Sequence, residues 1–183
     1  RFVFWGRAGN GRGLGFADFD GDGVEDLAVV NDFGEVLAFS GDGEPTTYKN
    51  FDELMERCAA IKREFESRIA TDYARHSSFD IRHSSFKLVL ITNASMFHRP
   101  HVQRGLAILD QNNGEIWAKL DAGTDEYYHL IERTPIPFRQ ILDNIPAAAK
   151  VRPLVIQSLF MRVNGEPPTQ AELEAFCDRL NEI

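Results

Sequence analysis

The acidic segment DFDGDGVEDL at residues 18–27 has the residue types and spacing that bind a hard cation. Carboxylates occupy positions 1, 3, 5 and 9 of this loop, and the glycine at position 6 permits a tight turn that directs several oxygens at one point. Without a metal, five carboxylates in nine residues would repel one another. The alternative is an acidic turn exposed to solvent. The candidate calcium ligands are Asp18, Asp20, Asp22, the carbonyl of Val24, and Asp26.

A second group of polar residues follows the predicted strands, beginning with the loop GDGEPTT at residues 41–47. Gly41 and Gly43 allow the backbone to approach a ligand closely. Glu44 offers acceptors to an ammonium group, and Pro45 stiffens the turn. Taken alone, this short motif is also compatible with an ordinary turn.

Polar residues also stand at the ends of three later predicted strands. Lys119 could pair with a carboxylate, and Asn93 or Asp121 with hydroxyl groups. The alternative for each is a polar strand end that a neighbouring loop satisfies. Together with the loop at residues 41–47, the candidate cofactor-binding residues are Gly41, Gly43, Glu44, Pro45, Asn93, Lys119, Asp121, Gln157 and Ser158.

From residue 36 onward, apolar strands alternate with amphipathic helices. Strands are predicted at residues 36–40, 87–92, 115–120 and 153–160. Helices are predicted at about residues 51–69, 100–111, 125–132, 138–149 and from 170 onward. Cap signals precede three of them, at Asn50 with Glu53, at Thr124, and at Thr169 with Glu172. This order predicts an α/β fold with a parallel sheet, open or closed into a barrel, that binds ligands at the carboxyl ends of its strands.

The strand ends resemble those of the radical S-adenosylmethionine (radical SAM) enzymes. The phrase FSGDGEPT at residues 39–46 resembles their GEP segment, which binds the amino group of the methionine moiety of SAM. The phrases LITN, WAKLDAG and VIQSLF, at residues 90–93, 117–123 and 155–160, resemble the third, fourth and fifth barrel strands in the same order. The resemblance implies an incomplete parallel (β/α) barrel that binds SAM for radical chemistry on an unknown substrate.

The cysteines depart from this family's pattern. Radical SAM enzymes hold a [4Fe–4S] cluster with a Cys-x3-Cys-x2-Cys loop after the first strand, and this sequence has no such loop. Cys58 and Cys177 fall on apolar stripes of predicted helices, where we expect buried, reduced thiols. The resemblance therefore implies a cluster only in a complete parent protein, and we expect the chain alone to be inactive as an enzyme.

The acidic segment has a resemblance of its own, to the FG-GAP or integrin-type propeller repeat. The phrase GFADFDGDG at residues 15–23, followed by DLAV, resembles that repeat, whereas an EF-hand would need a glutamate where Val29 stands. In the FG-GAP family this loop holds calcium between strands of a blade. Predicted strands at residues 2–5 and 27–30 indicate a short N-terminal β hairpin. The alternative function is therefore a non-enzymatic, calcium-binding FG-GAP-like repeat protein.

These resemblances divide the chain into a repeat fragment at residues 1–35 and a partial barrel at residues 36–183. We therefore expect a fragment, a fusion or a misassembled reading frame. The radical SAM part implies a cytoplasmic location, whereas the repeat type is usually extracellular. A tandem repeat at residues 75–86 places His76 and His83 seven residues apart, which favours a duplicated loop over a metal site.

Composition limits the partners. The formal net charge of −8 argues against a general nucleic-acid binder, which needs lysine and arginine to displace counterions. No apolar run reaches the length of a membrane span. The expected partner is a small-molecule cofactor, and the substrate cannot be read from these residues.

Overall fold

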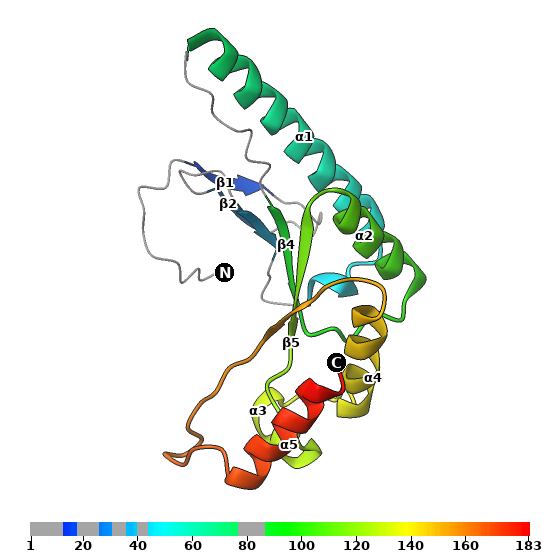
Figure 1. Cartoon of the computed structure of the whole chain (residues 1–183), viewed down its shortest axis with the longest axis vertical. Helices are drawn as coiled ribbons and strands as arrows, with labels where there is room; N and C mark the ends of the chain where they lie inside the picture. The colour runs from blue at the N-terminus through cyan, green and yellow to red at the C-terminus, as the bar shows by residue number, and fades with distance from the viewer. Residues whose placement is uncertain (1–12, 18–25, 31–35, 40–43, 77–86) are drawn as a thin grey trace.

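A parallel sheet forms the centre of the fold. The computed structural model describes residues 13–17, 26–30, 36–39, 44–76 and 87–183 (Figure 1). The strands follow the order β3 (Val36–Phe39), β4 (Lys87–Thr92), β5 (Gly114–Lys119) and β6 (Val155–Gln157). Each strand pairs with the next in parallel, and β3 and β6 stand at opposite edges. The predicted parallel α/β class is confirmed, and the sheet is open within the described residues.

The strands are connected by helices, as a parallel sheet requires, and one further helix follows the last strand. These are the short 3-10 helix η1 (Pro45–Thr47) and the α-helices α1 (Phe51–His76), α2 (Pro100–Gln111), α3 (Asp125–Glu132), α4 (Phe138–Ala149) and α5 (Gln170–Asn181). Figure 1 shows α1 and α2 side by side along one face of β4 and β5, whereas α3, α4 and α5 gather at one end of the sheet. No helix in the described ranges is long and apolar enough to cross a membrane.

The side chains of β5 show which face of the sheet the helices cover. Ile116 and Ala118 are buried, whereas Trp117 and Lys119 between and after them are only half-buried. Successive side chains point to opposite faces of a strand, so the first pair lies under the helices and the second pair on the other face. The helix-covered face continues into the main core, whose largest fully buried side chains are Phe51, Met55, Leu88, Leu90, Leu106, Leu109, Ile116, Leu120 and Ile145.

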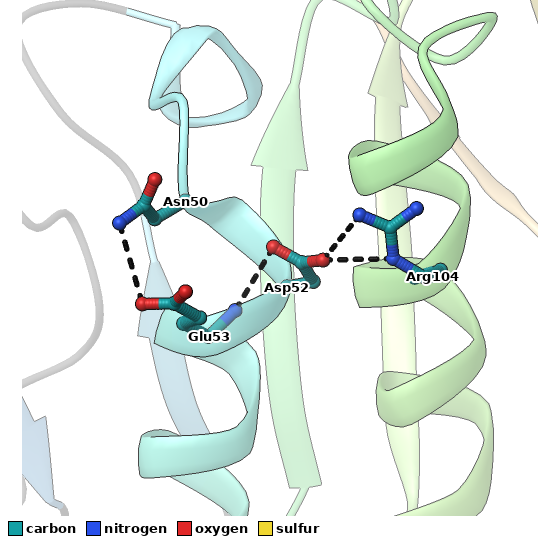
Figure 2. Close-up of polar contacts among 4 residues, drawn as sticks. All are labelled: Asn50, Asp52, Glu53 and Arg104. Atoms are coloured by element: carbon teal, nitrogen blue, oxygen red, sulfur yellow. Dashed lines mark hydrogen bonds and ion pairs between the residues drawn. The ribbon is translucent and has the colours of Figure 1, made fainter.

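An ion pair fixes the first turn of α1 against α2 (Figure 2). One oxygen of Asp52 contacts Nε and Nη2 of Arg104 at 2.8 and 2.7 Å, and its other oxygen accepts a hydrogen bond from the Glu53 amide. Slight burial raises the pKa of Asp52, but Arg104 and the backbone donors outweigh it, so the net pKa is lowered. The predicted cap of α1 at Asn50 and Glu53 differs from the structure. The side chain of Asn50 donates to the carboxylate of Glu53 at 3.3 Å, and the side chain of Asp52, not of Asn50, accepts from the Glu53 amide.

The N-terminal part is described only in short pieces. β1 (Gly13–Ala17) and β2 (Asp26–Val30) pair in an antiparallel register. The strand predicted at residues 2–5 and the connection at residues 18–25 lie outside the described residues, as do residues 77–86 of the tandem repeat.

From β3 onward, the predicted helices and strands agree with the structure except at a few positions. The sequence did not predict β1, and α1 continues past the predicted residue 69 to His76, into the tandem repeat that was interpreted as a loop. The last strand is shorter than predicted and ends at Gln157, because the amide of Leu159 donates to the carboxylate of Asp121 and not to another strand. In α1, the apolar spacing of residues 51–69 predicts Ile61 on the buried face, but Ile61 is 49% exposed and Lys62 is only 4% exposed. Cys58 is buried as predicted, but the prediction for Cys177 was wrong, since it is exposed on α5 beyond the buried Phe176.

Candidate functional site

A small hollow lies at the carboxyl ends of β4 and β5. Its volume is about 40 Å³, enough for one small polar group and far below the 300 Å³ or more (on the order of a whole ligand) of an enclosed binding pocket. Polar side chains come from the two strand ends and from α3 and its following turn. The hollow is lined by Asn93, Lys119, Leu120, Asp121, Tyr128, Glu132, Thr134, Phe138 and Ile141.

Lys119 is the cation of the hollow. Its ammonium lies 3.0 Å from Oδ2 of Asp121 and 3.9 Å from Oε1 of Glu132. Burial by itself lowers the pKa of Lys119, but the attraction of Asp121, Glu132 and Glu44 outweighs it and the net pKa is raised. Lys119 is therefore charged at neutral pH, and its side chain remains 38% exposed, so a ligand can reach it.

Asp121 is held on two sides. Its side chain is only 3% exposed, and its Oδ1 accepts a hydrogen bond of 2.8 Å from the Leu159 amide while Oδ2 faces Lys119. These contacts tie the segment after β6 to the end of β5. Asp121 therefore positions Lys119 and has few acceptor sites left for a ligand.

Glu132 completes the hollow from the last residue of α3. Burial raises the pKa of Glu132, its hydrogen bond with Asp121 raises it further, and Lys119 only partly opposes the rise. Burial likewise raises the pKa of the neighbouring Tyr128 to about 12, with Glu132 and Asp125 adding to it. Two carboxyl groups therefore compete for one lysine in a partly dehydrated site.

Glu44 fixes the end of β4 from the loop after β3. Its Oε1 accepts hydrogen bonds from the Thr46 amide and from the hydroxyls of Thr46 and Thr92, and its Oε2 accepts from the Asn93 amide at 2.7 Å. Four donors occupy the acceptor positions of a carboxylate. Glu44 therefore serves as a clamp between the two strand ends, and its charge also acts on Lys119.

The turn after β4 is strained and tightly held. Ala94 has a φ of 61°, in the left-handed region that a residue with a Cβ adopts at a cost. Asn144 of α4 donates to the carbonyls of Ala94 and Ser95 at 2.8 and 3.1 Å, and Gln140 donates to Ser95 at 2.6 Å. The side-chain oxygen of Asn93 accepts from the Ser95 amide at 2.9 Å. Within the described residues, this leaves the NH₂ group of Asn93 available to the hollow.

A second glutamate clamps the turn after β5. Glu172 of α5 accepts hydrogen bonds from the Gly123 amide at 2.5 Å and from the amide and hydroxyl of Thr124 at 3.1 and 2.5 Å. A Cβ at Gly123 would lie 2.1 Å from the Phe176 nitrogen, so only glycine permits α5 to pack this closely. Thr124 and Thr169 cap α3 and α5 as predicted. The predicted return contact from Glu172 to its own cap is replaced by this clamp.

The structure brings together four of the predicted cofactor-binding residues. Glu44, Asn93, Lys119 and Asp121 meet at the strand ends, with Pro45 at the start of η1. Gln157 pairs in register with Lys119, and its Oε1 is buried without a partner in the described part. Ser158 follows β6 and does not line the hollow. Gly41 and Gly43 lie outside the described residues.

The predicted calcium ligands lie almost entirely outside the described residues. Asp18, Asp20, Asp22 and Val24 are not described, and Asp26 is the first residue of β2. Among the residues that the structure does describe, no group of three or more histidine, cysteine, aspartate or glutamate side chains is placed to hold a metal ion.

Sequence reasoning missed the contributions of α3 and its following turn. Glu132, Thr134 and Tyr128 line the hollow together with Lys119. The available signal was a glutamate at the end of the helix that directly follows the Lys119 strand. That position carries no distinctive residue pattern, so only the path of α3 back over the strand end reveals it.

Similar proteins provide no support for a function of this hollow. No protein-family description, no curated protein and no solved structure matches the chain. The residues of the hollow are therefore the basis on which a function is proposed for the chain.

Proposed function

We propose that the α/β unit binds SAM as a segment of a radical SAM barrel, with the carboxylate of its methionine moiety in the hollow beside Lys119. The observation that carries this proposal is a charged, accessible lysine that lines the hollow together with Asn93, whose NH₂ group has no acceptor among the described residues, at the carboxyl ends of two parallel strands. Ligands of parallel α/β folds bind at this edge.

The donor set fits one end of the ligand. An ammonium has three donor protons, and Lys119 is within hydrogen-bonding distance only of Asp121 among the described residues, so it can still donate to a ligand carboxylate. The volume of about 40 Å³ accommodates that carboxylate but not the whole of SAM. The sulfonium, ribose and adenine would then lie over the sheet face opposite the helices.

The side chains on that face offer further contacts for the ligand. Trp117 stands two residues before Lys119 on the same face, and Gln157 stands beside Lys119 on β6. The indole of Trp117 provides a surface for an aromatic base, whereas Oε1 of Gln157 is buried and not exposed to a ligand. Lys119 and Trp117 therefore favour a ligand that combines charged and aromatic groups.

The residues present do not fit a [4Fe–4S] cluster. A cluster needs several thiolates close together. Cys58 is buried in α1, where burial raises its pKa to about 12, and Cys177 is exposed on α5. The proposal for this chain is therefore cofactor binding and not catalysis.

Calorimetric titration with SAM tests the proposal. We expect saturable binding that Lys119→Met weakens at least about tenfold, the effect of losing about 1.4 kcal/mol of charge-assisted hydrogen bonding. Lys87→Met is the matched control, because Lys87 pairs with Glu115 at the opposite end of the strands. Absence of SAM binding by the folded chain, or equal weakening by both variants, would refute the proposal.

A further inference from the structure

We propose that Glu132 holds a proton in the hollow that it lines together with Asp121, and that this proton controls whether a carboxylate enters the hollow beside Lys119. The inference deepens the proposed function, on which it rests for the identity of the ligand. It adds a mode of regulation: binding takes up a proton and is favoured by acid.

The contacts around Lys119 assign the proton to Glu132. Both oxygens of Asp121 already accept, one from the Leu159 amide and the other from Lys119. Glu132 lies farther from Lys119, at 3.9 Å, and lines the same hollow as Asp121. Two carboxylates that face one ammonium disfavour each other's ionisation, and the one farther from Lys119 is compensated less, so Glu132 is the group that carries the proton.

The charge of the hollow then depends on Glu132. With Glu132 protonated, the charges of Lys119 and Asp121 cancel, and the side chains that line the hollow present no net charge to a ligand carboxylate. With Glu132 ionised, the hollow has a net charge of −1 by formal count and repels the ligand. As the ligand carboxylate enters, Glu132 takes one proton from solvent and becomes a neutral acid.

Other charged groups act on the hollow but do not account for the proposed proton uptake. Lys119 and Asp121 face it from the end of β5, Glu132 and Tyr128 from α3, and the charge of Glu44 reaches it from the loop after β3. Glu44 is fully engaged by four donors, and burial raises the pKa of Tyr128 to about 12. His129 is half-exposed and pairs with Asp125, away from the lining residues.

Formate is a suitable probe, because it is the smallest carboxylate and matches the hollow in size. Its dissociation constant is measured on the whole chain by amide chemical shifts of the lining residues between about pH 5 and pH 8. The inference predicts that formate binding weakens about tenfold per pH unit above the midpoint of Glu132, the slope of one linked proton. Carbon-13 spectra of the glutamate carboxyls give that midpoint independently.

Two variants with side chains of similar shape test whether Glu132 or His129 causes the pH dependence of formate binding. Glu132→Gln removes the titrating group, so formate affinity becomes independent of pH while the fold is preserved. His129→Gln removes the imidazole of α3 and leaves the pH dependence unchanged. Three outcomes would each overturn the inference: formate binding to the unaltered chain that does not depend on pH, a pH dependence that persists in Glu132→Gln, or no formate binding at all. If formate binds as predicted and SAM does not, the proposed function fails and the proton-linked site stands.

Discussion

The carboxylate of Glu44 accepts a hydrogen bond of 2.7 Å from the backbone amide of Asn93, 49 residues later in the chain. The same carboxylate accepts from the hydroxyl of Thr92 at 2.5 Å, so one side chain from the loop after β3 fixes the end of β4. Because Asn93 lines the hollow, this contact links the fold of the sheet to the geometry of the candidate site.

Removal of the Glu44 carboxylate should loosen that strand end. Glu44→Ala leaves the Asn93 amide and two threonine hydroxyls without their acceptor, and we expect a loss of about 1–3 kcal/mol in the free energy of unfolding. Urea denaturation measures it. Glu53→Ala is the control, because Glu53 is exposed and contacts only Asn50 through its side chain in the described part. Equal stability of the Glu44 variant and the control would contradict the clamp.

The clamp from Glu172 should be stronger, because it is more deeply buried. Glu172 is 5% exposed and accepts three hydrogen bonds from the turn after β5, so we expect Glu172→Ala to cost about 2–4 kcal/mol. Glu174→Ala on the exposed side of α5 should cost less than about 0.5 kcal/mol. Thermal unfolding compares them. Amide hydrogen exchange at Gly123 should accelerate only in the Glu172 variant.

The two cysteines should differ sharply in reactivity. The attacking species is the thiolate, and burial raises the pKa of Cys58 to about 12, whereas Cys177 is exposed. With a thiol-specific chromogenic disulfide, we expect one thiol to react in the native chain and two after denaturation. Cys177→Ser should abolish the native reaction. Two thiols reacting at similar native rates would show that the packing of α1 described above is wrong.

The raised pKa of Glu132 predicts how stability changes with pH. The folded chain binds this proton more tightly than the unfolded chain, so the contribution is fully present below the unfolded pKa of about 4.3 and is lost as pH rises through the higher folded pKa. Urea denaturation across this range should show the decline. Glu132→Gln should remove it, whereas Glu126→Gln, an exposed residue of the same helix, should leave it in place. A decline of the same size in both variants would assign it to another group.

Local features of the sequence predicted most elements of the parallel α/β unit. The strand at residues 87–92 and the helices at residues 100–111, 125–132 and 138–149 agree with β4, α2, α3 and α4. Thr124 and Thr169 cap their helices because capping involves residues only three positions apart. Apolar periodicity also identified Cys58 as buried, since it reports which side of a helix faces the core, although it failed for Cys177.

Only the tertiary structure decided how the polar groups are used. Glu44 and Glu172 could be read from the sequence as a ligand acceptor and a local cap, yet each clamps a strand end about 49 residues away. Lys119 and Asp121 were recognisable at a strand end, but Glu132 enters the site because α3 folds back over it. Hydrogen bonding and burial depend on which segments meet, and sequence spacing determines that only within a helix or a strand. The sequence by itself therefore determined the alternation of strands and helices, and the packing between them determined the hollow.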